Sequence, residues 1–126
     1  HSDCLAFYPE DREAYWDSIG RAGGRVYFCG HDHLYNRAVI EDKAGHPIRQ
    51  VIAGTGGGYL VPWSGQYKES ERVKGEYSVV DHHGYILVIV GEMKVTIAWK
   101  AFPKEERAET WRILDSFSYT LPSTRN

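Results

Sequence analysis

The longest apolar run in the chain, Tyr85–Val90, is short enough to limit what the chain can fold into. A membrane-spanning helix needs roughly 18–20 consecutive apolar residues, and this run is far below that length. It has the length of an ordinary β-strand, and Gly84 and Gly91 stand at its two ends as turn signals. The run therefore predicts a fold assembled from short strands.

An antiparallel meander is the pattern of the second half of the chain. Val95, Ile97 and Trp99 alternate with more polar residues, so they are expected to share one face of a strand. The expected strands are Tyr77–Asp81, Tyr85–Val90 and Lys94–Phe102, with Asp115–Leu121 as a last edge strand.

The first half begins with a helix and continues with strands. Pro9 can open a helix, and the glycines from Gly20 to Gly24 can end it. A stripe of apolar residues at helical spacing is its expected core face: Ala14, Tyr15, Ile19 and Ala22. The expected strands are Val26–Cys29, Arg37–Asp42 and Ile48–Ala53, the last two joined by a turn at Lys43–Pro47.

The composition is that of one ordinary globular domain. With 126 residues, 42% of them hydrophobic, residues 1–126 are enough for one core and too few for two domains. A formal net charge of −2 provides no basic surface, so neither nucleic acid nor a membrane is expected as a partner. The two cysteines, Cys4 and Cys29, are expected as free thiols, with Cys29 at the end of a buried strand.

Two histidines separated by one residue follow the first strand directly, in the sequence Gly30-His31-Asp32-His33, which we call the histidine loop. A neutral imidazole is a good ligand for zinc, iron or manganese, and this spacing predicts a pair of histidine ligands at a metal site. Gly30 would allow an unusual backbone angle at the end of the strand. Two ligands do not fill the coordination shell of a metal ion, so further ligands are needed.

A glycine-rich loop, Gly54–Gly58, follows the strand Ile48–Ala53. Its backbone N–H groups could approach an anion, which makes Gly56 and Gly57 candidate substrate-binding residues. The loop lacks the lysine of a P-loop and the spacing of a dinucleotide-binding turn, and a tight turn under packed aromatic residues explains it equally well. Farther along, Trp63 and Tyr67 either line a cleft or fix their loop to the core.

The string Val26–Arg37, VYFCGHDHLYNR, resembles the last metal-binding block of the calcineurin-like metallophosphoesterases, which include the purple acid phosphatases. In that family a hydrophobic strand runs into Gly-His-x-His, often with a tyrosine and an arginine shortly after, here Tyr35 and Arg37. The segments Val51–Gly57 and Leu114–Phe117 also resemble the family's carboxyl-terminal part. The resemblance covers most of the chain, and Gly-His-x-His is its most specific motif.

The resemblance implies an α+β fold, namely the β-rich half of an α/β/β/α sandwich with one amino-terminal helix and then mostly antiparallel strands. It also implies hydrolysis of a phosphate ester with two metal ions of the zinc, manganese or iron class. His31 would ligate one metal ion and His33 the other. Tyr35 and Arg37 are candidate substrate contacts, with packing under the sheet edge as their structural alternative.

The other ligands of that family are absent from this chain. They come from Asp-x-His, Gly-Asp-x-x-Asp and Gly-Asn-His blocks upstream, and only His1 stands near the place of a further histidine ligand. The chain begins without an initiator methionine or a signal peptide, and no compartment is assigned. We expect the carboxyl-terminal part of a metallophosphoesterase domain, inactive alone, binding at most one metal ion weakly, and self-associating through the face that truncation exposes.

Two other functions fit parts of the sequence. A cupin-like metal barrel needs a glutamate three or four residues after His-x-His, and the first glutamate here, Glu41, is too distant. A non-catalytic binding domain would recognise a partner through the glycine-rich loop and exposed aromatic residues, and it is the alternative to the enzyme. The remaining histidines, His46, His82 and His83, are expected in solvated turns.

Overall fold

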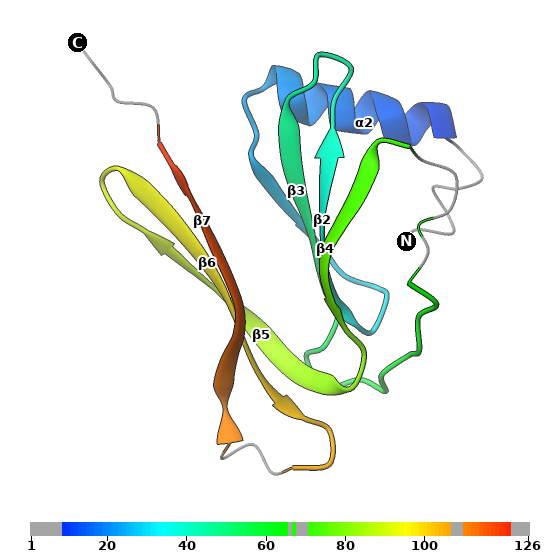
Figure 1. Ribbon diagram of the computed structural model, residues 1–126, viewed down its shortest axis with the longest axis vertical. Coiled ribbons are helices and arrows are strands. Elements are labelled where there is room, and N and C mark those ends of the chain that lie inside the picture. The colour runs from blue at the N-terminus through cyan, green and yellow to red at the C-terminus, as the bar shows by residue number, and fades with distance from the viewer. Residues whose placement is uncertain (1–8, 66, 68–70, 107–109, 122–126) are drawn as a thin grey trace.

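The computed structural model describes residues 9–65, 67, 71–106 and 110–121, which form one helix and two β-sheets (Figure 1). This combination of a helix with two mostly antiparallel sheets confirms the expected α+β class. The described residues include no helix that is long and apolar enough to span a membrane. The elements are α2 (Pro9–Arg21), β1 (Val26–Cys29), β2 (Tyr35–Glu41), β3 (Pro47–Ala53), β4 (Val73–Val79), β5 (His82–Val90), β6 (Lys94–Pro103) and β7 (Arg112–Thr120).

The seven strands divide into a four-stranded and a three-stranded sheet. The four-stranded sheet has the order β1-β3-β2-β4, with β1 and β3 parallel and the other neighbours antiparallel. The three-stranded sheet is an antiparallel meander in the order β5-β6-β7. The expected β2–β3 hairpin and the last edge strand, β7, are thus confirmed.

The expected meander is wrong in its first strand. Residues 77–79 belong to β4, which pairs with β2 in the four-stranded sheet and not with β5. Only Val80 and Asp81 connect β4 to β5, so the chain passes between the sheets without a hairpin turn. His82 and His83, expected in that turn, instead begin β5 and pair with Pro103 and Phe102.

The four-stranded sheet lies between the helix and the three-stranded sheet (Figure 1). On one face, the indole N–H of Trp16 in α2 donates to the hydroxyl of Tyr27 in β1, at 3.2 Å. On the other face, Tyr35 of β2 stacks on Trp99 of β6, with ring centroids 4.0 Å apart. Tyr35 and Trp99 belong to the buried cluster that joins the two sheets.

Helix α2 starts and ends as the sequence predicts. Pro9 is its first residue, acidic residues occupy its first turn and Arg21 its last, as the helix dipole favours. Gly23 takes a φ of 74°, and the N–H of Gly24 donates to the carbonyl of Ile19 at 2.9 Å. These contacts form a Schellman cap, which stops the helix and turns the chain toward β1.

The face that α2 buries differs from the expected one. Tyr15, in the apolar stripe, is 52% exposed, and the buried residues are Arg12, Trp16 and Asp17. The ring of Trp16 lies 5.0 Å from the Arg12 guanidinium and 5.4 Å from that of Arg72. Cation–π contacts therefore cover the indole, and hydrophobic periodicity does not detect this kind of packing.

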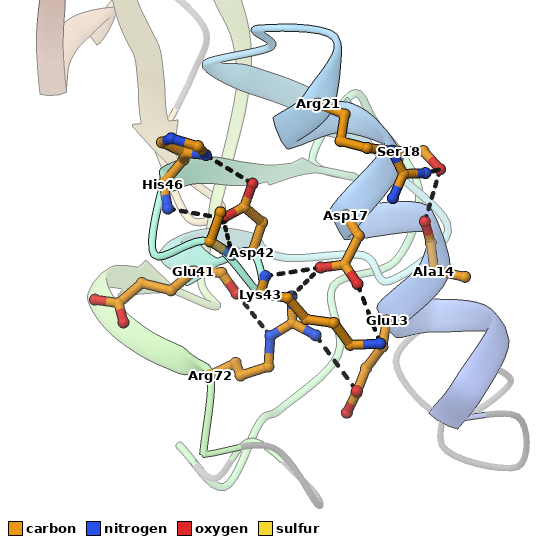
Figure 2. Close-up of polar contacts among 11 residues, drawn as sticks. Glu13, Ala14, Asp17, Ser18, Arg21, Glu41, Asp42, Lys43, His46 and Arg72 are labelled. Atoms are coloured by element: carbon orange, nitrogen blue, oxygen red, sulfur yellow. Dashed lines mark hydrogen bonds and ion pairs between the residues drawn. The ribbon is translucent and has the colours of Figure 1, made fainter.

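Asp17 fixes the helix to the β2–β3 turn and to the segment before β4 (Figure 2). Its carboxylate accepts hydrogen bonds from the backbone N–H of Lys43 at 2.9 Å and from Arg72 at 2.7 Å. These bonds lower the pKa of Asp17 against the opposing effect of its burial. A buried carboxylate thus holds α2 in place because its charge is paired.

Two edge strands are rich in apolar residues: β1 in the four-stranded sheet and β5 in the three-stranded sheet. Phe28 of β1 is 47% exposed and β1 is an edge strand, so the expectation of a buried first strand is wrong. Val95, Ile97 and Trp99 of β6 are buried as expected. Their neighbour β5 is an edge strand whose last residues are all exposed: Leu87, Val88, Ile89 and Val90.

Candidate functional site

The histidine loop and the glycine-rich loop leave the four-stranded sheet at the same edge. They follow β1 and β3, which run parallel with Cys29 opposite Ile52. The carboxyl ends of parallel strands meet at one edge, where open sheets place their sites. Backbone hydrogen bonds from the N–H of Gly54 to Leu34 (3.2 Å) and from the N–H of Val61 to His33 (3.1 Å) tie the two segments together.

Two glycines permit this close approach, and they are not the two that we expected to bind substrate. A Cβ atom on Gly54 would lie 1.9 Å from the carbonyl oxygen of Asp32, and one on Gly58 would lie 2.9 Å from the ring of His33. Close packing therefore requires glycine at both positions. A Cβ atom on Gly56 or Gly57 would meet nothing within 4 Å, and both residues are exposed.

The ring of His33 is oriented by the backbone of the glycine-rich segment. Its Nδ1 lies 2.7 Å from the carbonyl oxygen of Tyr59. Because a carbonyl only accepts, Nδ1 carries the hydrogen and donates it, so Nε2 holds the lone pair of the neutral imidazole. Metal-ligating histidines are oriented in this way, with one nitrogen donating to a carbonyl and the other binding the ion.

His31 is exposed and has a φ of 78°, the one positive φ of a non-glycine residue in the described chain. This left-handed conformation costs a non-glycine residue roughly 1–2 kcal/mol, and strained residues cluster at binding sites. The unusual angle was expected at Gly30, which instead has a negative φ and open space where a Cβ atom would be. The strain therefore falls on the candidate ligand itself.

Tyr35 and Arg37 hold the two sheets together. Tyr35 is 1% exposed, and its hydroxyl donates to Asp115 of β7 at 2.7 Å. Arg37 donates to both oxygens of the same carboxylate, at 2.8 and 3.1 Å, and pairs with Glu76. Burial, with the help of Asp115, raises the pKa of the Tyr35 phenol, so the hydroxyl stays a donor. A substrate contact through either residue would require this network to open.

The aromatic loop after the glycines is fixed to the sheet. The hydroxyl of Tyr67 and the amide of Asn36, which is 2% exposed, exchange hydrogen bonds of 2.7 and 3.0 Å. Trp63 packs edge-on against Tyr67, with ring centroids 5.0 Å apart. Of the two roles open for Trp63 and Tyr67, the structure shows the one that fixes the loop to the core.

Cys29 is a free thiol at the end of β1, as expected, and Cys4 lies outside the described residues. Its Sγ is 3.7 Å from the carbonyl oxygen of Val51. Burial raises the pKa of this thiol to about 11, which keeps it protonated near neutral pH.

His46 and His82 each lie beside an aspartate. His46 is in the β2–β3 turn as expected, 3.0 Å from Asp42, and His82 is 2.7 Å from Asp81. His1 lies outside the described residues. Within the described ranges, no group of three or more His, Cys, Asp and Glu side chains is close enough to hold a metal ion.

Tyr59, Gly54 and Gly58 are the residues of this site that sequence reasoning missed. Tyr59 acts on His33 through its carbonyl group, which every residue has, so its identity carries no signal. The string Gly-Thr-Gly-Gly-Gly does not show which of its glycines are closely packed.

Comparisons with protein-family models, with curated proteins and with solved structures found no match to this chain.

Proposed function

We propose that this chain supplies part of a two-metal site for phosphate-ester hydrolysis, within a metallophosphoesterase-type domain whose remaining ligands lie outside the chain. The observation that carries the proposal is the 2.7 Å hydrogen bond between His33 Nδ1 and the carbonyl of Tyr59, at the carboxyl end of a strand. It directs Nε2 toward a ligand role. The succession of helix, four-stranded sheet and three-stranded sheet supports the assignment to half of an α/β/β/α sandwich.

The donor types fit metal ions of the zinc, manganese and iron class. Imidazole suits these ions, and His31 and His33 offer two such groups one residue apart. Two bound metal ions would provide a hydroxide nucleophile near neutral pH and neutralise charge on the phosphoryl oxygens. Further ligands, including carboxylates, would come from the parent domain, so the isolated chain would bind one ion weakly and have no activity.

The residues of this chain orient the two imidazoles. Gly54 and Gly58 let the glycine-rich segment pack closely against the histidine loop, and the carbonyl of Tyr59 fixes the ring of His33. Strand β2 begins one residue after that loop and is held to the second sheet by Tyr35 and Arg37. In this proposal Tyr35 and Arg37 are positioning residues that keep the end of the loop still.

A metal titration tests the proposal directly. Zn²⁺ or Mn²⁺ is titrated into the chain and into His31→Ala, His33→Ala and His46→Ala variants by calorimetry. We expect weak binding of one ion, reduced by at least about tenfold in the first two variants. The His46→Ala variant is the matched control, because His46 lies in the exposed β2–β3 turn. Binding that is unchanged in both His31 and His33 variants would refute the ligand roles.

The complete parent protein provides the test of activity. With metal added, hydrolysis of an aryl phosphate should be lost in His31→Ala and in His33→Ala and retained in His46→Ala. Activity that survives the loss of both histidines would contradict the proposal.

The exposed apolar surface favours a second candidate, a non-catalytic binding domain. Tyr59 is 78% exposed, and Ile89 and Val90 on β5 are 60% and 70% exposed. Such a domain would bind its partner without metal, so a partner interaction that is unaffected by His31→Ala and by metal removal would favour it.

A further inference from the structure

A cleft of about 450 Å³ opens next to the histidine loop, beside Tyr59. Four of its lining residues are aromatic or apolar: Tyr59, Leu60, Pro62 and Val80. The other three can carry charge: Asp81, His83 and Lys104. Small-molecule sites typically have 300–1,000 Å³ and combine an apolar wall with a few polar groups, and this cleft fits both criteria.

Tyr59 belongs both to this cleft and to the candidate metal site. Its carbonyl accepts the hydrogen bond of His33, and the two rings meet edge-on with centroids 4.8 Å apart. With 78% of its surface exposed, the same ring can also contact a molecule in the cleft. A ligand held there would therefore lie next to the imidazole that we assign to the metal.

The polar residues of the cleft define what it can bind. Asp81 and Lys104 both line the cleft, and a 2.9 Å hydrogen bond from the backbone N–H of Lys104 to the carbonyl of Asp81 joins their backbones. A lining with one carboxylate and one ammonium group does not select a bare anion such as phosphate. They match a neutral group that can both donate and accept hydrogen bonds.

His83 adds a polar group that is short of a partner. Its Nδ1 is buried and has no hydrogen-bond partner within the described chain. The ring packs against Phe102, with centroids 5.7 Å apart, and also lines the cleft. A hydroxyl or ring nitrogen of a ligand could pair with it.

We propose that this cleft binds the leaving group of the phosphate ester, a planar aromatic group with a polar substituent. The ring would lie against Tyr59 and Pro62, and the substituent would pair with His83 or Lys104. The assignment as a leaving group rests on the proposed function, whereas the binding of an aromatic molecule can be measured without metal or phosphate.

Phenol and cyclohexanol are a matched pair of probes, because both have one hydroxyl group and a six-membered ring. Chemical-shift titration of the chain should place phenol at the cleft with a Kd on the order of 10 mM, typical of so small a molecule. Cyclohexanol, which cannot stack on Tyr59, should bind the cleft at least about threefold more weakly, as judged by the Kd fitted to its own titration. Equal Kd values for both probes, or shifts located elsewhere, would overturn the proposal.

Variants assign the binding to the cleft residues. Tyr59→Ala and His83→Ala should each reduce the phenol shifts at least about threefold, whereas Tyr59→Phe and His46→Ala should retain them. Phenol binding that is unchanged in Tyr59→Ala would refute the proposal. Because Tyr59 is exposed, its substitution should not impair folding, and circular dichroism checks this.

The same variants separate this proposal from the metal site. His83→Ala changes a residue of the cleft that is not part of the metal site, so zinc binding should persist while phenol binding falls. His31→Ala should lose zinc and keep phenol. If the unmodified chain binds zinc but not phenol, the cleft proposal is refuted and the metal-site proposal stands. If it binds phenol but not zinc, the metal-site proposal is refuted and the binding of an aromatic molecule in the cleft stands.

Discussion

Gly54→Ala should destabilise the protein, because it forces a methyl group into the backbone of the histidine loop. The new Cβ would lie 1.9 Å from the Asp32 carbonyl oxygen and 3.2 Å from the Cα of His33. Real Cβ atoms do not approach closer than 3.0 Å, so the two backbone segments must separate by about 1.1 Å. Overpacking of this kind typically costs 1–3 kcal/mol, and we expect about 2–3 kcal/mol because both partners are backbone.

Gly56→Ala is the matched control for this prediction. A Cβ atom on Gly56 meets nothing within 4 Å, and its φ is not positive, so stability should change by less than about 0.5 kcal/mol. Urea unfolding followed by tryptophan fluorescence gives the free energy of unfolding of both variants. Equal stability of the two variants, with unchanged slopes in urea, would refute the packing of the glycine-rich segment against the histidine loop.

Three further predictions concern stability and association. Tyr35→Phe removes the 2.7 Å hydrogen bond to Asp115 and should lower the free energy of unfolding by about 1–2 kcal/mol; a neutral result would show that the bond contributes nothing. Asp42 accepts hydrogen bonds from the backbone N–H and the ring of His46, and these bonds lower the pKa of its carboxyl group. Their contribution to the free energy of unfolding should therefore be present at neutral pH and be lost as the pH falls below about 4. Urea midpoints across that range should fall more steeply than those of Asp42→Asn. Ile89→Lys, on the exposed edge strand β5, should reduce self-association in sedimentation equilibrium, and a wild-type chain that is strictly monomeric at high concentration would contradict this.

Strands could be predicted from the sequence because their signal is local, whereas their partners could not. The alternation of Val95, Ile97 and Trp99 correctly predicts the buried face of β6. The residues of β4 contain no information on whether they pair with β5, which follows directly, or with β2. That choice depends on contacts such as Tyr77 opposite Arg37, forty positions apart in the chain.

The helix shows a second limit of pattern reading. The apolar stripe that includes Tyr15 and Ile19 satisfies helical periodicity, yet the structure buries Arg12, Trp16 and Asp17. Their burial depends on charged partners from distant segments, Lys43 and Arg72 among them. A helical wheel that scores only hydrophobicity cannot find such a face.

In the candidate site, the position of the histidine loop after β1 could be predicted from the sequence. The groups that hold the loop in place could not. Gly-His-x-His directly after an apolar run is a local signal. The groups that orient it are a backbone carbonyl at Tyr59 and the missing side chains of Gly54 and Gly58, and neither leaves a distinctive pattern of residue types.

The left-handed backbone of His31 has a consequence for how this position would respond to selection. Glycine adopts a φ of 78° without strain and asparagine tolerates it, so a library of variants selected only for resistance to proteolysis should enrich both at position 31. A library selected for metal retention should keep histidine. If His31 binds a metal ion as we propose, folding and metal binding favour different residues at this position.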